Sequence, residues 1–511
     1  MHRFFPQRVE RVDPNALFES VSGQTRTAMP SALSSTRSTF GPIKATRKPV
    51  VTLALLLLAG CAVGPDYKRP DTAVPAAFTE AGPWKVAAPK DNLPKGAWWK
   101  IFHDPTLDAL ETQAAAASPT IQAAVARRDQ AYAIAGISRA DLFPLLSLDP
   151  SGSRARYSGN RQTQVPATRS SYTTNSYNLP LDLGYEIDLW GRVRRANESA
   201  RALAEASDAA YQTVLLGVQA DVAQVYFTLR SLTEESGLVD RSIDTRRKAL
   251  DLVRTLYSGG AGAQLDVLQA ETELASAESD ALTLAQDRTV LRHLLALLCG
   301  QLPENFVFDD TGVLPAAVPA LPVGLPSELL ERRPDVAGAE RTLAATSAQI
   351  GFAKSAFFPS ISLIGSAGYN SNDLNSLFNW DSRQWSLGPS LSLPIFQGGR
   401  NVANYDRAKA AYAEAVANYR EHVLVAFQEV EDGLSRLHNL DQQSLVLIRA
   451  VNSSRQAATL STLRYKAGLV SYLEVVDAER TALQNERIAT QFNAQRFIAS
   501  VLLVKAFGGG W

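Results

Sequence analysis

A duplication runs through this sequence and limits its possible folds more than any other feature. Within the 511 residues, the same landmarks recur at an offset of 215 residues and, further along, at an offset of 208 residues. Phe143-Pro144 matches Phe358-Pro359 at the first offset, and Gly191-Arg192 matches Gly399-Arg400 at the second. A repeat of this length predicts one structural unit that is present twice.

The landmarks divide the chain into segments. Residues 119–300 and 334–511 are predicted to be the two copies of the unit. Between them, residues 301–333 form a linker that proline interrupts at positions 303, 315, 319, 322 and 326. Residues 61–118 form a separate N-terminal segment, and residues 1–60 precede the mature chain.

Helices are expected to dominate each copy. An alanine-rich helix comes first and stops before the Phe-Pro pair, because the residue before proline disfavours helical backbone. A longer helix follows, with apolar residues at spacings of three and four and no proline. A glycine-containing turn then leads into a returning helix. These helices are expected at 121–141, 192–256 and 265–299, and at 336–356, 400–464 and 473–506.

The length of the second helix constrains the architecture. About 65 residues at about 1.5 Å per residue span roughly 95 Å, which is too long for the core of one globular domain. The long helix and the returning helix are therefore expected to form an extended hairpin in each copy.

Two strand-like segments lie between the first and second helix of each copy. In residues 179–189 and 385–395, apolar and polar residues alternate with a period of two. Alternation over about ten residues, edged by aromatic residues, is typical of a transmembrane β-strand. A half-buried strand of a soluble sheet alternates in the same way, so the pattern alone leaves both interpretations open.

The N-terminal region resembles a lipoprotein signal peptide. Basic residues precede the apolar run 50–58, which ends in Leu58-Ala59-Gly60-Cys61. The run is shorter than the roughly 20 apolar residues that span a bilayer. Its last four residues resemble a bacterial lipobox, so Cys61 is expected to carry a covalent lipid. Ala62 rather than aspartate follows, which favours transfer to the outer membrane.

Charge and composition argue against other classes of protein. Lys+Arg 51 and Asp+Glu 51 balance, so the basic surplus of a nucleic-acid binder is absent. Two cysteines and five histidines without a CxxC or HExxH motif predict no metal site. No combination of nucleophile, base and metal predicts an enzyme, and no cofactor is expected apart from the lipid on Cys61.

The small number of strands bears on how the chain would assemble in a membrane. A sheet in lipid must close on itself, because an open edge leaves backbone groups unpaired. Four strands per chain are too few, since closed barrels begin at about eight strands. If the strands cross a membrane, the chain must therefore oligomerise. A ring of subunits would also pack the helical hairpins side by side into a tube.

Several short motifs are distributed along the chain from Cys61 to Trp511. They are Cys61-Ala-Val-Gly-Pro-Asp66-Tyr67, Trp98-Trp99 with Phe102, Asp104-Pro105 and Leu107, Glu186-Ile-Asp188-Leu-Trp190-Gly-Arg192, Arg333-Pro-Asp-Val-Ala-Gly-Ala-Glu340, Phe357-Phe358-Pro359 and Gly508-Gly-Gly-Trp511. Together these motifs resemble the TolC-like outer membrane factor family, in its lipoprotein branch that serves resistance-nodulation-division (RND) efflux pumps.

The resemblance implies an α+β membrane protein. Its expected form is a homotrimeric outer-membrane β-barrel with four strands per chain, continued into the periplasm by a long α-helical barrel built from the two repeats. Its expected function is a passive exit duct for drugs, toxic compounds or metals. The expected partners are a periplasmic adaptor, an inner-membrane RND-type transporter and outer-membrane lipid. Alternatives are the duct of a type I protein secretion system and a non-channel structural lipoprotein of the periplasm.

The resemblance also implies a gate. By position it falls on Leu473, Asp477 and Arg480, whose spacing of four and three places them on one helical face. Arg480 is expected to supply a counter-charge for Asp477. Without the resemblance, an ordinary solvated pair of charged residues three positions apart is the alternative interpretation.

The two glycine turns are expected to dock the adaptor, because they lie at the ends of the hairpins that point away from the membrane. They are Tyr257–Ala263 and Tyr465–Ser471. Tyr257 and Tyr465 open the turns, and Gly260 and Gly468 provide the backbone freedom for a tight reversal.

Overall fold

The computed structural model describes residues 62–70, 96–160, 171–309, 314–315, 317–319 and 332–509. The chain divides into two units, Met1–Leu57 and Leu58–Trp511, and all described residues belong to the second. The predicted signal peptide, the lipid-attachment residue Cys61 and most of the linker lie outside the described residues.

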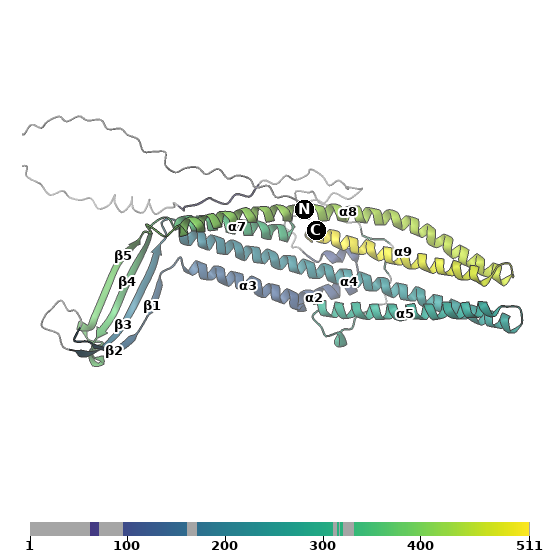
Figure 1. Ribbon diagram of the computed structural model, residues 1–511, viewed down its shortest axis with the longest axis horizontal. Coiled ribbons are helices and arrows are strands. Elements are labelled where there is room, and N and C mark those ends of the chain that lie inside the picture. Colours follow the sequence, from purple (N-terminus) through teal and green to yellow (C-terminus); the bar gives the residue numbers. More distant parts are fainter. Residues whose placement is uncertain are drawn as a thin grey trace, which may run out of the picture. The chain divides into compact units, whose positions relative to one another are not determined.

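The helices of the second unit occur where the repeat predicts them (Figure 1). Within the two copies, their bounds differ from the expected bounds by at most two residues, whereas the helix Pro105–Ala117 of the N-terminal segment was not predicted. The helices are α2 (Pro105–Ala117), α3 (Pro119–Ala140), α4 (Arg192–Ser258), α5 (Gln264–Leu298), α7 (Pro334–Ser355), α8 (Arg400–Lys466) and α9 (Tyr472–Ala506). Proline at the first position of α3 and of α7 suits a helix start, where its missing N–H is not needed.

The two hairpin turns have the same backbone design. Gly260 and Gly468 adopt φ values of 76° and 73°, in the left-handed region that favours glycine. The next residue closes the turn in each copy: Ala261 N–H donates to Leu256 O, and Leu469 N–H donates to Arg464 O, each at 2.9 Å. This pairing is a Schellman motif, which ends a helix and reverses the chain.

One antiparallel sheet joins the two copies. Its strands are β1 (Leu145–Leu148), β2 (Ser151–Tyr157), β3 (Tyr172–Ile187), β4 (Ser360–Ser371) and β5 (Arg383–Ser392). Both β1 and β2 pair with β3, along successive stretches of it, so they form one interrupted edge row. The rows then follow the order β1/β2, β3, β4, β5. The four rows match the expected four strands.

The interruption has a cause in the neighbouring strand. Pro180 in β3 has no N–H to donate, and the break at Asp149-Pro150 lies beside it, where Asp149 N–H donates to Pro180 O at 3.3 Å. The sheet therefore loses no ladder bond at Pro180.

The sheet has one apolar face and one polar face. Leu181 aligns with Ala367 and Trp385 across three strands, whereas the neighbouring row aligns Asp182 with Ser366 and Ser386. Directly opposed residues share a face, so the alternation of the sequence becomes a difference between faces.

The predicted segments 179–189 and 385–395 extend past the ends of the observed strands β3 and β5. Leu189, Leu393 and Ile395 lie beyond the strand ends. β4 begins only at Ser360, after Pro359, so its neighbours have no partner beyond Ile187 and Ser392.

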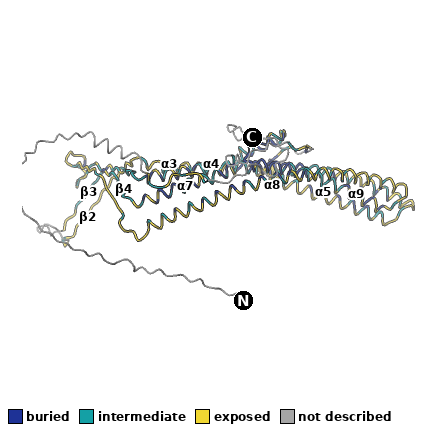
Figure 2. Tube along the Cα trace, turned by 90° about the horizontal axis from the view of Figure 1, so that it is seen from above, coloured by how far each residue is buried: buried dark blue, intermediate teal, exposed yellow. Residues whose placement is uncertain are grey.

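The helices form a layer that continues from the sheet. Near the sheet, α4 packs between α3 and α7, and α7 packs on α8. Further away, α4 contacts α5 and α9, and α9 contacts α8. Figure 1 shows the sheet at one end of this unit and both hairpin turns at the other. Buried residues gather in the helical part, as Figure 2 shows.

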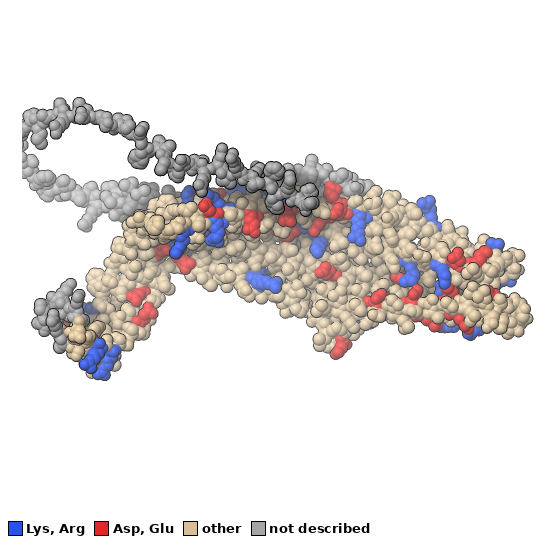
Figure 3. Space-filling model, in the orientation of Figure 1, with Lys and Arg blue, Asp and Glu red and all other residues tan. Residues whose placement is uncertain are grey.

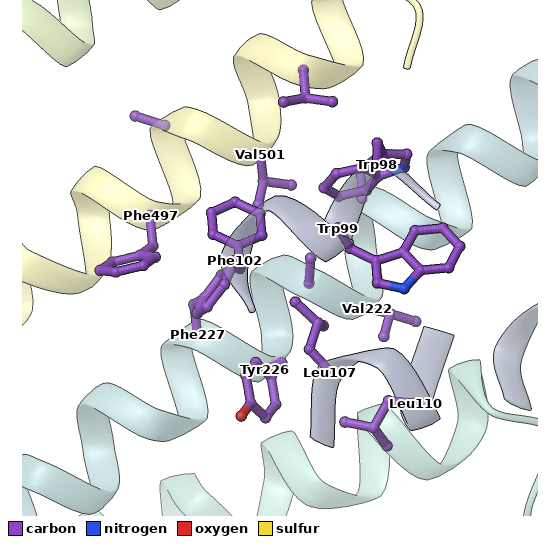
Figure 4. Packing of buried hydrophobic residues seen from close by; sticks show 14 of the residues in the cluster. Trp98, Trp99, Phe102, Leu107, Leu110, Val222, Tyr226, Phe227, Phe497 and Val501 are labelled. Carbon is purple, nitrogen blue, oxygen red and sulfur yellow. The ribbon is translucent and has the colours of Figure 1, made fainter. Parts of the chain in front are cut away.

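An aromatic cluster fixes the middle of the helical part (Figure 4). Phe102, in the 3₁₀ segment η1 (Trp98–Phe102), lies 4.9 Å from Phe227 of α4, measured between ring centroids. Phe227 in turn lies 5.0 Å from Phe497 of α9. The N-terminal segment therefore packs against helices of both copies.

Beside this cluster, α2 buries a carboxyl group. The Glu111 side chain is 0% exposed, and neither of its oxygens has a hydrogen-bond partner. Burial, and secondarily the charge of Asp108, raises the pKa of Glu111 from about 4.5 to about 9. Glu111 is therefore neutral in the folded protein at pH 7.

We predict that the Glu111→Gln variant resists alkaline pH better than the wild type. Between pH 5 and pH 9 the unfolded chain ionises Glu111 and the folded chain does not. The free energy of unfolding should then fall with pH by up to about 1.4 kcal/mol per unit in the wild type, relative to Glu111→Gln. Thermal melts in detergent across this range test it, with the exposed Glu304→Gln as control. Parallel curves for wild type and Glu111→Gln would contradict the prediction.

Candidate functional site

The three predicted gate residues lie at the start of α9, directly after the second hairpin turn. Leu473 is 59% exposed, and Asp477 and Arg480 are exposed as well. Tyr472, Val475 and other residues on the opposite side of the helix are buried against α4 and α5. The structure thus brings the three residues together on one accessible face, as their spacing predicts.

Arg480 pairs with a residue that the sequence did not single out. Its Nε donates to Glu273 Oε2 of α5 at 3.0 Å, rather than to Asp477. Glu273 is only 5% exposed, and Arg246 of α4 approaches the same carboxylate at 3.0 Å. A buried carboxylate requires such compensation, which explains why Arg480 turns towards it. In the described part of the chain, Asp477 forms no ion pair.

A second connection lies one heptad further along. Arg487 of α9 contacts Glu235 of α4 at 2.6 Å and Asp280 of α5 at 3.3 Å. Arg480 and Arg487 are seven residues apart, as are Glu273 and Asp280, so the contacts between α9 and α5 follow a coiled-coil repeat. We call the contacts of Arg480 and Arg487 with Glu273, Glu235 and Asp280 the hairpin tie.

Burial and the paired charges shift the pKa of three groups around the hairpin tie. Burial raises the pKa of Glu479, and Arg246 partly opposes this effect. Burial also raises the pKa of the Tyr472 hydroxyl to about 12, with help from Glu479 and Glu273. The hydrogen bond to Glu273 raises the pKa of Arg480, which therefore stays charged.

The four predicted docking residues lie at the two hairpin turns. A Cβ atom added at Gly260 or Gly468 would meet no atom within 4 Å, so only the left-handed backbone demands glycine there. Tyr257 is half exposed, and the Tyr465 ring lies 5.5 Å from the Tyr472 ring. The turns are accessible surfaces.

Residues 62–70 form a strap across the helices, which the sequence did not predict. Asp66 pairs with Arg195 of α4 at 2.7 Å. Tyr67 donates to Glu340 of α7 at 3.3 Å, and Arg69 donates to the hydroxyl of Tyr419 of α8 at 3.1 Å. The only sequence signal was the motif from Cys61 to Tyr67, which gave no position for the strap.

The strap begins where the sheet meets the helices. Val63 N–H donates to Trp190 O at 2.9 Å. Trp190 stacks on Phe358 at 4.8 Å, and its indole N–H donates to Pro359 O at 2.8 Å. Val63, the second residue after Cys61, is thereby held at this junction.

The acidic residues near the end of β3 do not form a catalytic pair. Glu186 accepts from Arg192 Nε at 2.7 Å, and Asp188 pairs with Arg194 at 3.3 Å. In the ranges that the structure describes, no three His, Cys, Asp or Glu residues form a possible metal cluster. Among the described helices, none combines the length and the apolar character that crossing a bilayer requires.

The second unit leaves its two lateral edges open. β1/β2 and β5 are the edge rows of the sheet, and α3 and α8 are the outer helices of the layer near the sheet. Large apolar side chains are exposed on both outer helices, including Ile137 of α3 and Leu424 of α8. Both edges therefore offer surfaces that a single chain does not cover.

Known proteins share this arrangement. A family model described as outer membrane efflux protein matches residues 110–301 and 325–509, once in each copy. "Outer membrane protein OprJ" of Pseudomonas aeruginosa is 34% identical over 475 residues, covering 91% of this chain and 97% of the relative. "Cation efflux system protein CusC" of Escherichia coli O6:H1 is 32% identical over 460 residues, covering 89% and 97%.

A solved structure has a similar fold. The structure titled "Structural insights of the outer-membrane channel OprN" matches with a TM-score of 0.82 and 33% identity. The match covers 88% of this chain and 100% of the other.

We predict that the Glu273→Ala variant loosens the contact between the hairpins. The change leaves the buried Arg246 without its carboxylate, and breaking a buried pair typically costs about 3–5 kcal/mol. Hydrogen exchange measured by mass spectrometry should accelerate in peptides of α5 and α9 near the hairpin tie.

The matched control is Glu271→Ala, two residues away. Glu271 is accessible and pairs with the equally accessible Arg254, so its loss should cost about 0–1 kcal/mol. Equal exchange in the two variants would show that the hairpin tie carries no special stability.

Proposed function

Because this chain belongs to the outer membrane efflux protein family, we propose that it is the exit duct of a tripartite efflux pump. It is an outer-membrane efflux channel with a periplasmic extension, and not an enzyme. The family and the fold predicted from the motifs are confirmed. One observation carries the proposal: a sheet with an apolar and a polar face continues directly into long helical hairpins.

The sheet fits the apolar layer of a membrane. β3 and β4 pair over Tyr177–Ile187, which is eleven residues. Transmembrane β-strands need about 9–11 residues when they are tilted. The face that carries Leu181, Leu183 and Trp385 would contact lipid, and the face that carries Asp182 would line a wet lumen.

The functional unit of the proposal is a homotrimer. Four rows of strand cannot close, and an open edge in lipid leaves backbone groups unpaired. Three chains supply twelve rows, which falls within the range of closed barrels. The two open edges differ from each other, so joining one to the other produces a head-to-tail ring.

A lipid on Cys61 fits the position of the strap. The strap holds Ala62 against Gly191, where a Cβ atom would lie 2.9 Å from the Ala62 Cβ. This contact lies at the sheet–helix junction, where the apolar face ends. A diacylglycerol group attached one residue earlier would therefore enter the periplasmic leaflet beside the barrel.

The gate of the proposal is the inner end of the helical barrel. Leu473, Asp477 and Arg480 would surround the threefold axis, and the hairpin tie would hold α9 in the closed position. The first copy has Leu265, Gln269 and Thr272 at the corresponding positions, so only one hairpin of each chain carries the charges.

The hairpin turns would meet the periplasmic adaptor, which links the duct to an inner-membrane RND-type transporter. Tyr257, Gly260, Tyr465 and Gly468 lie at the points farthest from the sheet (Figure 1). The duct would export small molecules such as drugs, toxic compounds or metals. CusC is named for cation efflux.

We predict that the purified protein is a trimer and restores efflux. Native mass spectrometry of the full chain in detergent should give three subunits per particle. Expression in a strain that lacks its own duct, together with an adaptor and an RND transporter, should restore resistance to the compounds that this pump exports. A monomer with intact β-structure would contradict the trimer. Export of a polypeptide substrate instead would favour the type I secretion duct.

We predict that weakening the hairpin tie opens the channel. Arg480→Gln combined with Arg487→Gln removes its cations, and a loss of about 1.4 kcal/mol would raise the open-to-closed ratio about tenfold. Conductance in planar bilayers should rise accordingly, while Asp477→Ala should alter its sensitivity to cations.

Arg464→Gln is the control, because Arg464 pairs with Glu474 within one hairpin. It should conduct like the wild type. If the double variant also conducts like the wild type, the constriction lies elsewhere.

A further inference from the structure

The end of the sheet away from the helices carries arginines on both of its edge rows, and the channel function does not use them. The five strands contain three basic residues: Arg154 and Arg156 of β2, and Arg383 of β5. All three are exposed. Figure 3 shows Lys and Arg side chains at this end of the sheet. We call these three residues the arginine rim.

The arginine rim lies on the apolar face. Arg383 is opposite Tyr369, which is opposite Leu179. Arg154 and Arg156 are opposite Asn175 and Thr173, which alternate in phase with Leu179 along β3. All three arginines therefore share the face of the leucines, but sit at or beyond the end of the apolar band.

The acidic residues of the strands cannot neutralise the arginine rim. Asp182 and Glu186 lie on the opposite face and closer to the helices. In the loops at this end, the carboxylate of Asp373 accepts from Asn375 N–H. Asp381 precedes Arg383 by two residues, without an ion pair between them in the described chain.

The guanidinium groups have unused donors. Arg383 Nε donates to Trp380 O at 2.9 Å, and its guanidinium lies over the Trp380 ring. Arg156 Nη2 makes a long hydrogen bond of 3.4 Å to Ser171 Oγ. Each guanidinium has five N–H donors, so among the residues that the structure describes, most donors of the arginine rim have no acceptor.

We propose that the arginine rim binds the phosphate groups of lipopolysaccharide in the outer leaflet. The proposal rests on the outer-membrane location of the channel. A lipid-facing arginine above the apolar band meets the head-group region, and a guanidinium suits the geometry of phosphate. Below it, Trp385 and Leu387 are 81% and 62% exposed and offer an apolar surface to acyl chains.

Ring closure strengthens the site. In a head-to-tail trimer, the β5 edge of one subunit lies beside the β1/β2 edge of the next. Arg383 of one chain then joins Arg154 and Arg156 of its neighbour on one continuous lipid-facing surface. A glycolipid with two phosphates would contact both subunits.

The test compares three forms of the full-length protein in detergent. They are the wild type, the triple variant Arg154→Gln/Arg156→Gln/Arg383→Gln, and the charge-preserving triple variant with lysine at the same positions. Native mass spectrometry and competition with a fluorescent lipid A measure the binding of diphosphoryl lipid A, monophosphoryl lipid A and phosphatidylglycerol. Channel conductance and trimer content are recorded for every form.

The expected result is that the glutamine variant binds diphosphoryl lipid A about tenfold more weakly than the wild type, because it loses the charged donors that would contact the phosphates. The lysine variant should retain most of the binding, and monophosphoryl lipid A should bind more weakly than the diphosphoryl form. Unchanged binding by the glutamine variant, or phosphatidylglycerol that competes as well as lipid A, would overturn the proposal.

Conductance separates this proposal from the proposed function. The glutamine variant should insert and conduct like the wild type, because the arginine rim faces away from the lumen. A wild-type protein that bound lipid A but formed no channel would refute the duct and leave the lipid site standing.

Discussion

Unpaired backbone groups at the sheet edges are the constraint on which the rest of this structure depends. In hydrocarbon an unpaired N–H or C=O costs several kcal/mol, so the edge row β1/β2 and the edge strand β5 must both find partners. The chain provides four rows, so in the proposed duct further copies of the chain would supply the missing edges. Closure of such a barrel would set the number of subunits, and that number would set how many hairpins surround the axis.

The helical part is held together by different interactions in its middle and near the hairpin turns. The aromatic cluster around Phe102, Phe227 and Phe497 excludes water and joins both copies in the middle. The hairpin tie joins the same copies near the turns through charged groups. Packed rings resist separation, whereas ion pairs can be exchanged for water or for another partner's charges. In the proposed duct, this contrast would place the opening movement at the end of the hairpins.

Periodicity was sufficient to predict most of the fold. The helices begin and end where proline and glycine dictate, and the four rows follow from period-two alternation and the duplication. The ends of β3 and β5 were harder, because they depend on where the partner strand β4 begins. Alternation continues through Leu189 and Ile395 although the ladder has already stopped.

In the candidate site, too, local sequence patterns predict some features, and others depend on contacts with distant residues. The shared face of Leu473, Asp477 and Arg480 follows from helical spacing. The partner of Arg480 does not, because Glu273 lies 207 residues earlier and only tertiary packing makes it the nearest buried carboxylate. The strap was equally inaccessible to local reasoning. Its contacts with Arg195, Glu340 and Tyr419 join four distant parts of the chain.

The break between β1 and β2 bears on how a newly made subunit survives before it meets its partners. A long, regular edge strand is a template for any passing strand, and such templates seed aggregates. Here one edge is interrupted at Asp149-Pro150, and the other, β5, contains Pro389. Proline at an edge removes a donor that a growing stack of strands would need. Each edge is therefore a poorer template for arbitrary strands than a long and regular edge strand would be.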